Sequence, residues 1–320
     1  MSELRWHPLL RQWVAVAAQR QERPQLPDTW CPFCPGSGRV PGHYDVYLYP
    51  NDFPAFALDS QPFEPSQADQ VLFRTTGARG ACDVVLYHPG HNLLPSQLPV
   101  EHWHKIVKLW TRRSAELAAR PDIEYVYVFE NTGLAIGVTM PHPHGQIYAF
   151  PFLPPLVRVE LDSASAHFSQ HGECLYCRIL AEELREGSRL VAQNGSFVAF
   201  VAFFARFPAE VQLYSRRHLG ALADLTEAEA TDLAALLRSV RQKYDQLHGS
   251  PLPLMMIVRQ RPAHGEHPYF HFHVEFLPIQ RSKTKLKYLA AVESGAGTFL
   301  NDTRAEEMAE QLRRAGDACA

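Results

Sequence analysis

The feature that most constrains the fold is an internal repeat that extends over most of the chain. Each half contains, in the same order, a Cys-x-x-Cys pair, a histidine, a helical pattern, a strand pattern and a His-x-His pair. The interval from His91 to His142 nearly equals that from His218 to His271. Since chance would have to reproduce the whole order twice, the repeat indicates two tandem copies of one structural unit.

Hydrophobic periodicity predicts one long helix in each copy. Apolar residues recur at helical spacing over 99–119 in the first copy and over 226–247 in the second. At the start of the second helix, Thr226 and Glu229 have the spacing of a capping box. We therefore expect two equivalent helices, each beside the strands of its own copy.

The strands and the boundary between the copies follow from similar patterns. Residues 270–276 alternate between apolar and polar side chains, as in a half-buried strand. Residues 151–172 are first proline-rich and then charged, which is typical of a connection. The sequence therefore predicts a first half over 1–158 and a second half over 159–320.

Each half also contains four candidate metal ligands. Cys2His2 sets bind tetrahedral zinc, and here they are Cys31, Cys34, His91 and His142 in the first half and Cys174, Cys177, His218 and His271 in the second. Pro32 lies within the first Cys-x-x-Cys pair and Pro35 directly follows it, and both disfavour the helix that a thioredoxin-like redox motif needs. Such sets leave no open coordination position, so we predict structural zinc. The alternative is that the thiols are small buried apolar groups.

The run Met140-Pro-His-Pro-His-Gly-Gln contains one histidine more than the zinc site uses. If His142 binds the metal, His144 remains beside Gly145 and Gln146, and a glycine lets a phosphate approach the backbone closely. In the second half His273 and Glu275 occupy the matching places. We therefore predict that only the first half carries a reaction, the alternative being a proline-rich turn that happens to carry histidines.

Composition and charge exclude several classes of protein. The content of 46% hydrophobic and 20% charged residues is typical of a globular chain, and no apolar run approaches the roughly 20 residues of a membrane-spanning helix. A net charge of −3 provides no basic footprint for nucleic acid. The first residues lack the apolar core of a secretion signal, so we expect a cytoplasmic protein with neither nucleic-acid nor membrane partners.

Taken together, these motifs resemble the galactose-1-phosphate uridylyltransferases, a branch of the histidine-triad superfamily. The resemblance covers essentially the whole chain and is most specific at 130–146, where Glu-Asn-x-Gly precedes Pro-His-Pro-His-Gly-Gln. It implies an α+β fold of two tandem histidine-triad-like halves, each an antiparallel sheet with helices packed on it. It also implies a homodimer.

The activity that the resemblance implies is a ping-pong exchange of UMP in galactose metabolism, in the Leloir pathway. His144 would attack the α-phosphorus of UDP-glucose, and galactose 1-phosphate would then take the uridylyl group from the histidine. Gln146 and Thr139 would donate hydrogen bonds to a phosphate oxygen. An amide cannot act as a general base for water, so Gln146 favours transfer to a sugar phosphate over hydrolysis.

The same resemblance assigns the substrate contacts. Asn51, Asp52 and Asn131 would hold the uridine and phosphates, with Arg20 and Arg23 near the phosphate. Lys287, Tyr288 and Glu293 would contact the hexose, from the partner subunit. From residue types alone, the two arginines are a solvated surface, and Asn-Asp is most often turn chemistry.

Two departures from the family pattern concern the second metal and the sugar. Some relatives have an iron site, whose matching positions here are Glu160, His264, His271 and His273. Those relatives lack the second Cys-x-x-Cys pair, so we predict zinc there, with iron as the alternative. Val292 stands where a hexose-contacting tyrosine is common.

Two other functions remain open on the sequence. A related phosphorylase would use phosphate as acceptor and ADP-glucose or a dinucleoside polyphosphate as donor, through an adenylyl-histidine at His144. A zinc-stabilised nucleotide-binding protein without turnover would use the same residues structurally. Selectivity for the donor nucleotide distinguishes the first alternative, and the absence of covalent labelling distinguishes the second.

Overall fold

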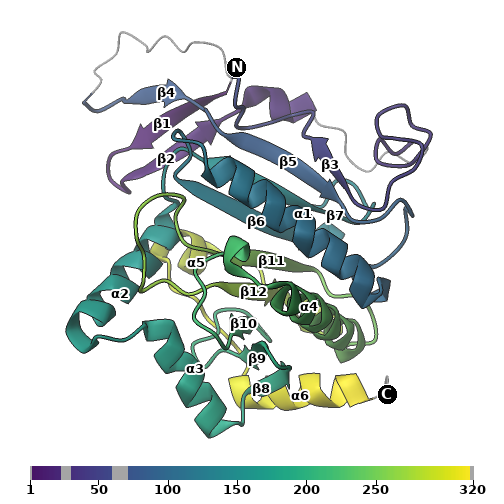
Figure 1. Ribbon diagram of the computed structural model, residues 1–320, viewed down its shortest axis with the longest axis vertical. Helices are drawn as coiled ribbons and strands as arrows, with labels where there is room; N and C mark the ends of the chain where they lie inside the picture. The colour runs from purple at the N-terminus through teal and green to yellow at the C-terminus, as the bar shows by residue number, and fades with distance from the viewer. Residues whose placement is uncertain (1, 23–29, 60–70, 318–320) are drawn as a thin grey trace.

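One antiparallel sheet of nine strands forms the centre of the computed structural model, which describes residues 2–22, 30–59 and 71–317 (Figure 1). Its spatial order is β3-β5-β7-β6-β11-β12-β10-β9-β8. The first half supplies β3 (Tyr47–Pro50), β5 (Ala81–Leu86), β6 (Tyr125–Thr132) and β7 (His144–Phe150). The second half supplies β8 (Leu190–Gln193), β9 (Phe197–Val201), β10 (Val211–Ser215), β11 (Leu254–Arg259) and β12 (His273–Pro278).

The two halves meet in the middle of the sheet, where β6 pairs with β11. Phe129 lies opposite Ile257 in this pair. Phe129 also faces Gln146 on β7, just as Ile257 faces Glu275 on β12. The order and register of the strands are therefore the same on either side of the β6–β11 pair. This repetition confirms the α+β fold of two tandem halves. The two predicted sheets join edge to edge, which pairs backbone groups that a free edge would leave exposed.

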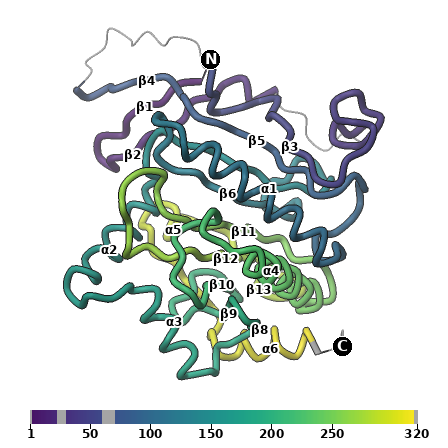
Figure 2. Tube along the Cα trace, viewed as in Figure 1, coloured from purple at the N-terminus to yellow at the C-terminus, as the bar shows by residue number. Residues whose placement is uncertain are grey.

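Two long helices, α1 (Val100–Ala118) and α4 (Glu227–Leu247), cover one face of the sheet and pack side by side (Figures 1 and 2). Trp103 of α1 is fully buried in the core between the helices and the sheet. The predicted capping box is present, since the Thr226 hydroxyl accepts from the Glu229 N–H and the Glu229 carboxylate accepts from the Thr226 N–H. Both predicted helices are confirmed.

Helices α2 (Pro155–His171) and α3 (Leu175–Glu186) pack on the other face of the second half. Val157 of α2 and Leu180 of α3 are buried in one cluster with Phe200 of β9. The stretch predicted as a connection is thus largely helical and contributes to the core. The division of the chain within it stays a prediction.

The strand predicted over 270–276 differs from the structure in its start and its burial. β12 begins only at His273, and all of its residues are buried. Phe276 packs in the core beneath α4, whereas Leu277 packs in a cluster on the opposite face. Because both faces of this central strand are covered, the apolar–polar alternation does not correspond to a solvent-exposed side.

Smaller elements complete the described part of the chain. The N-terminal residues form a separate sheet, β2-β1-β4, that lies beside β5 in Figure 1. These elements are β1 (Glu3–His7), β2 (Gln12–Val16), β4 (Thr75–Gly77), β13 (Gln280–Ser282), β14 (Lys285–Leu286), α5 (Ala291–Ala296), α6 (Ala305–Asp317) and the 3₁₀ turns Ala18–Glu22, Pro95–Gln97, Leu134–Ile136 and Leu222–Asp224. None of the described helices is long and apolar enough to cross a membrane.

Candidate active site and metal centres

The first Cys2His2 set converges as predicted, with its four ligand atoms all within 4.8 Å of one another. Cys34 Sγ lies 3.4 Å from His91 Nδ1 and 3.6 Å from His142 Nδ1, and Cys31 Sγ lies 3.9 Å from His142 Nδ1. Tetrahedral zinc, with Zn–S near 2.3 Å and Zn–N near 2.0–2.1 Å, sets sulfur and nitrogen about 3.6 Å apart. The residues therefore fit a tetrahedral metal ion.

Neighbouring groups prepare this site for a cation. The His142 Nε2–H donates to the His88 carbonyl at 2.8 Å, which leaves Nδ1 as the ligand atom. Burial lowers the pKa of His142 to about 4, so the imidazole is neutral at pH 7. Burial also raises the pKa of Cys31 to about 11, and a bound cation would offset that cost of forming the thiolate.

The second Cys2His2 set has the same geometry. Cys177 Sγ lies 3.4 Å from both His218 Nδ1 and His271 Nδ1, and the His271 Nε2–H donates to the Ser215 carbonyl at 2.8 Å. Its ligand atoms also lie within 4.8 Å of one another, and these two sets are the only such groups among the described residues.

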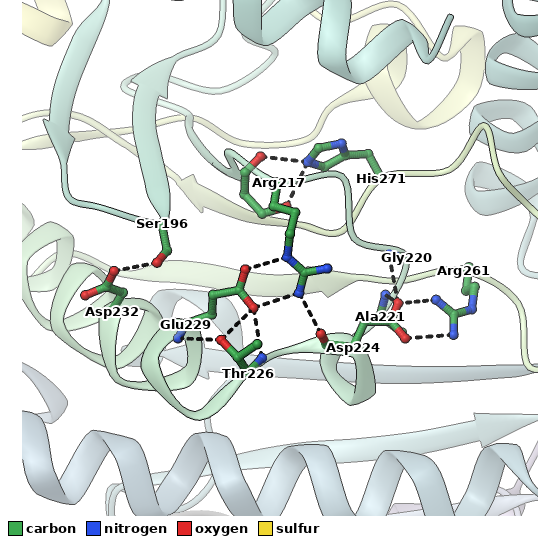
Figure 3. Close-up of polar contacts among 11 residues, drawn as sticks. Ser196, Arg217, Gly220, Ala221, Asp224, Thr226, Glu229, Asp232, Arg261 and His271 are labelled. Atoms are coloured by element: carbon green, nitrogen blue, oxygen red, sulfur yellow. Dashed lines mark hydrogen bonds and ion pairs between the residues drawn. The ribbon is translucent and has the colours of Figure 1, made fainter.

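The loop that carries His218 is fastened to the start of α4 (Figure 3). Arg217 donates to both carboxylate oxygens of Glu229 at 2.8 Å and to the Asp224 carbonyl at 2.9 Å. The Asp224 carboxylate in turn pairs with Arg261. These contacts connect the loop that carries His218 to the first turn of α4.

The alternative iron site is not assembled. His264 Nε2 is 3.0 Å from the Arg120 carbonyl, and Glu160 pairs with Arg259 at 3.4 Å. His271 instead belongs to the second Cys2His2 set. The geometry thus supports the predicted cysteine site, in which the metal is set by sulfur and nitrogen ligands.

His144 begins β7, two residues after a metal ligand. Its Nδ1–H donates to the His142 carbonyl at 2.7 Å. Because a carbonyl oxygen only accepts, this bond assigns the proton of the neutral imidazole to Nδ1 and the lone pair to Nε2. His142 therefore contributes to two places, since its side chain belongs to the candidate metal set and its carbonyl orients the ring of His144.

Two cavities lie against His144. The first, of about 230 Å³, is also lined by Asn51, Asp52 and Gln146. The second, of about 210 Å³, is also lined by Asn131. The fold thus brings His144 together with the side-chain amides of Asn51, Asn131 and Gln146. These residues come from segments that are far apart in the sequence.

The sequence did not single out three side chains of the first cavity: Trp30, Arg39 and Tyr49. Arg39 pairs with Asp52, and the Tyr49 hydroxyl donates to the same carboxylate at 2.8 Å. An arginine in a glycine-rich turn carries no periodic signal, so only the folded chain reveals that it faces the cavity.

Other predicted contact residues take different positions. The Asn51 side chain accepts from the Phe53 N–H, which is the expected turn bond, and Arg20 donates to the Phe53 carbonyl at 2.9 Å. The Thr139 hydroxyl oxygen is buried and has no hydrogen-bond partner among the described residues. Arg23 lies outside the described residues.

The predicted hexose contacts lie away from both cavities. Lys287 Nζ is 2.8 Å from Glu293, and the Tyr288 side chain is exposed. None of the three residues lines either cavity. Within one chain, therefore, they do not complete the site at His144.

The matching place in the second half is closed. His273 is fully buried, its ring lies 5.1 Å from that of Tyr176, and burial lowers its pKa to about 4. Glu275, which matches Gln146, pairs with Arg259 at 3.1 Å. Aromatic packing and a buried ion pair fill the space that the cavities occupy in the first half.

Comparisons with known proteins agree with this architecture. Models of the galactose-1-phosphate uridyl transferase N-terminal and C-terminal domains match residues 1–154 and 160–318. The galactose-1-phosphate uridylyltransferase of Thermotoga maritima is 39% identical over 316 residues, 98% of each chain. That of Rattus norvegicus is 33% identical over 334 residues, which covers 97% of this chain and 86% of the relative.

Solved structures show the same relationship. A uridylyltransferase superimposes with a TM-score of 0.91 at 35% identity and covers 99% of both chains. An ADP-glucose phosphorylase from Arabidopsis thaliana, with bound ADP-glucose, superimposes with a TM-score of 0.76 at 26% identity over 98% of both chains. Fold and relatives together define the class as nucleotidyltransferase enzymes. Within that class, the chain belongs to the galactose-1-phosphate uridylyltransferase family.

Proposed function

We propose that the protein exchanges UMP between UDP-glucose and galactose 1-phosphate through a uridylyl-histidine at His144. The observation that supports this most directly is the hydrogen bond from His144 Nδ1 to the His142 carbonyl, beside two cavities. An imidazole whose Nδ1–H is held in this way directs the lone pair of Nε2 outward, where it can act as a nucleophile.

The proposed chemistry has two balanced steps. His144 Nε2 forms a bond to the α-phosphorus of UDP-glucose, and the bond from that phosphorus to the bridging oxygen breaks, releasing glucose 1-phosphate. The phosphate oxygen of galactose 1-phosphate then attacks the same phosphorus and displaces the histidine. The Nδ1–H bond to His142 stabilises the positive charge on the imidazole of the intermediate.

The cavities support a division of substrate contacts. Asn51 and Asp52 would hold the nucleoside in the first cavity, with Gln146 donating to a non-bridging oxygen. Asn131 would hold the phosphates on the second side. Thr139, which lines neither cavity, stays a proposed donor to a phosphate oxygen. Arg20 and Arg23 stay proposed phosphate contacts.

We further propose zinc as the metal of both Cys2His2 sets and a cytoplasmic homodimer as the active form. Thiolate and imidazole ligands in a closed tetrahedron suit Zn²⁺ and leave no position for substrate. The dimer would bring Lys287, Tyr288 and Glu293 of one subunit to the hexose bound at His144 of the other.

The decisive experiment is incubation with UDP-glucose alone, followed by intact-mass measurement. We expect a gain of one uridylyl group, which is absent in His144→Gly and is discharged by galactose 1-phosphate. An adduct with ADP-glucose but none with UDP-glucose would instead favour the phosphorylase, a reaction known for one of the similar structures. No adduct with either donor would leave the nucleotide-binding alternative.

A further inference from the structure

A buried polar cluster lies on the helix-facing side of the reactive strands. Arg241 of α4 pairs with Glu130 of β6 at 2.5 Å and donates to the Thr132 hydroxyl at 3.1 Å. That hydroxyl donates to the same Glu130 carboxylate at 2.7 Å. The side chains of Arg241 and Glu130 are only 4% and 2% exposed, so this contact between the two halves is almost fully shielded from solvent.

The cluster lies directly beneath residues of the candidate active site. Side chains alternate along a strand, so Glu130 and Thr132 point towards the helices while Asn131, between them, points to the reactive face. Glu130, Asn131 and Thr132 all line the cavity that His144 also lines. The contacts of Glu130 and Thr132 with Arg241 therefore restrain the backbone at Asn131, which lies between them.

Tyr87 supports the neighbouring reactive strand from the same side. Its side chain is fully buried against Trp103 and Trp110 of α1. A Cβ added to Gly145 would lie 2.2 Å from the Tyr87 hydroxyl oxygen. The hydroxyl thus occupies the space that a side chain at Gly145 would need. It therefore limits how closely β7 can approach the core at the residue between His144 and Gln146.

The second half lacks these groups at the matching places. Since Gln146 matches Glu275, the strand pairings match Glu130 with Val258. By the same registers, Leu86 faces His144 as Tyr214 faces His273, which matches Tyr87 with Ser215 and Gly145 with Val274. The tyrosine–glycine and carboxylate features therefore belong to the half that carries the candidate active site.

Stability alone does not account for the cluster. Arg241 Nε is buried and has no hydrogen-bond partner among the described residues, and burial near the Glu130 carboxylate raises the pKa of Tyr87 well above its usual value. Buried ion pairs are often no better for stability than apolar side chains of the same volume, and unmatched polar atoms add to their cost. Because the Tyr87–Gly145 contact and the Glu130 carboxylate have no counterpart at the matching places of the second half, we infer a role for them in the reaction.

We propose that Tyr87, Glu130 and Arg241 are positioning residues for uridylyl transfer. They support β6 and β7 on the side of the sheet that faces α1 and α4. This support would keep Asn131 and His144 at the distance from each other that binding of the phosphate requires. One of them, Arg241, comes from the second half, which would make the closed half a support for the reactive one. The inference rests on the proposed function of His144.

The test compares the rate of uridylylation of His144 in a single turnover at saturating UDP-glucose. Tyr87→Phe removes one oxygen and keeps the packing, and the double variant Glu130→Met/Arg241→Met removes both charges at similar volume. We expect each to lower the rate about tenfold or more, because small misplacements of reacting groups are costly, while the dissociation constant for UDP-glucose stays within about twofold.

The matched control is Glu183→Met/Arg189→Met, which removes another buried ion pair, with a separation of 2.8 Å, in the second half. It should shift the melting temperature but leave the single-turnover rate unchanged. In an Asn131→Ala background, Glu130→Met/Arg241→Met should lower the uridylylation rate by a smaller factor than in the wild-type protein. This is expected if Glu130 and Arg241 affect the rate by positioning Asn131.

Wild-type rates in both Tyr87→Phe and Glu130→Met/Arg241→Met would overturn the proposal, as would an equal loss of rate in the control. If the double variant does not fold, Tyr87→Phe alone decides. Absence of any uridylyl adduct on the wild-type protein would be a failure of the proposed function itself, and the two failures are therefore distinguishable.

Discussion

At the scale of single residues, His144 and its counterpart His273 share the same orienting hydrogen bond. Each donates Nδ1–H to the carbonyl two residues earlier, at 2.7 Å and 2.8 Å. They differ in access, because His144 is half-buried beside two cavities whereas His273 is sealed beneath Tyr176 and Phe270. The two histidines therefore differ in their access to a cavity and not in the hydrogen bond that orients the ring, which is the difference expected if His144 is the nucleophile.

Gly145→Ala tests how closely the core supports the reactive strand. The new Cβ would overlap the Tyr87 hydroxyl, so we expect a loss of about 1–3 kcal/mol in the free energy of unfolding and slower uridylylation. Tyr87→Phe in the same chain should recover part of the stability. Gly42→Ala, where a Cβ meets no atom within 4 Å, is the control, and equal losses in both variants in chemical denaturation would contradict this explanation.

The pH dependence of stability should report the Glu229 contact at the start of α4. The Arg217 guanidinium and the Thr226 N–H lower the pKa of this carboxyl from 4.5 to about 2. A lowered pKa in the folded state contributes stability above the unfolded value of 4.5, and the contribution disappears as the pH falls towards 2. Glu229→Gln should therefore cost about 1 kcal/mol at pH 7, and urea titrations should show the difference from wild type vanishing near pH 2. A difference independent of pH would contradict the assignment.

At the scale of elements, each Cys-x-x-Cys turn joins a loop to the end of a strand through the metal site. The first set links the turn at Cys31 to the segment before β7, and the second links the start of α3 to the segment before β12. Between the cysteines, Phe33 packs on the ring of His144 at 5.5 Å, and Tyr176 takes the equivalent place on His273. If the first set binds its metal, metal binding and the placement of His144, the proposed nucleophile, would be coupled through one turn.

Cys31→Ser should strongly destabilise the first half. Structural zinc contributes its binding free energy to folding, so we expect a loss of several kcal/mol and of about one equivalent of zinc, measured by calorimetry and metal analysis. Cys82→Ser, at a buried thiol outside both metal sets, is the control and should keep the metal. Unchanged melting after verified loss of zinc would refute a structural role.

At the scale of the whole molecule, one continuous sheet makes the two halves mechanically dependent. β6 and β11 pair along their length, and α1 and α4 pack on each other across the boundary. The Lys108–Glu227 pair at 2.6 Å and the Arg241–Glu130 pair also cross it. A half that has lost its own cavity can thus remain necessary to the other.

Mixing two inactive variants tests the proposed dimer. His144→Gly lacks the nucleophile and Lys287→Met lacks a proposed hexose contact, so a mixed dimer would contain one intact site. After unfolding and refolding together in equal amounts, we expect about a quarter of the wild-type activity, because half of the randomly formed dimers are mixed. Activity no higher than the sum of the two variants alone would contradict a site shared between subunits.

The sequence by itself determined the repeat, both Cys2His2 sets, the two long helices and the position of His144. These features are encoded locally, as spacing and periodicity along one segment or as the same order twice. Only the tertiary structure decided that β6 joins β11, that β12 is buried on both faces, that Arg39 faces the first cavity and that Arg241 lies beneath the reactive strands. Each of these depends on which distant surfaces meet, and a contact between segments remote in sequence leaves no periodic trace in either one.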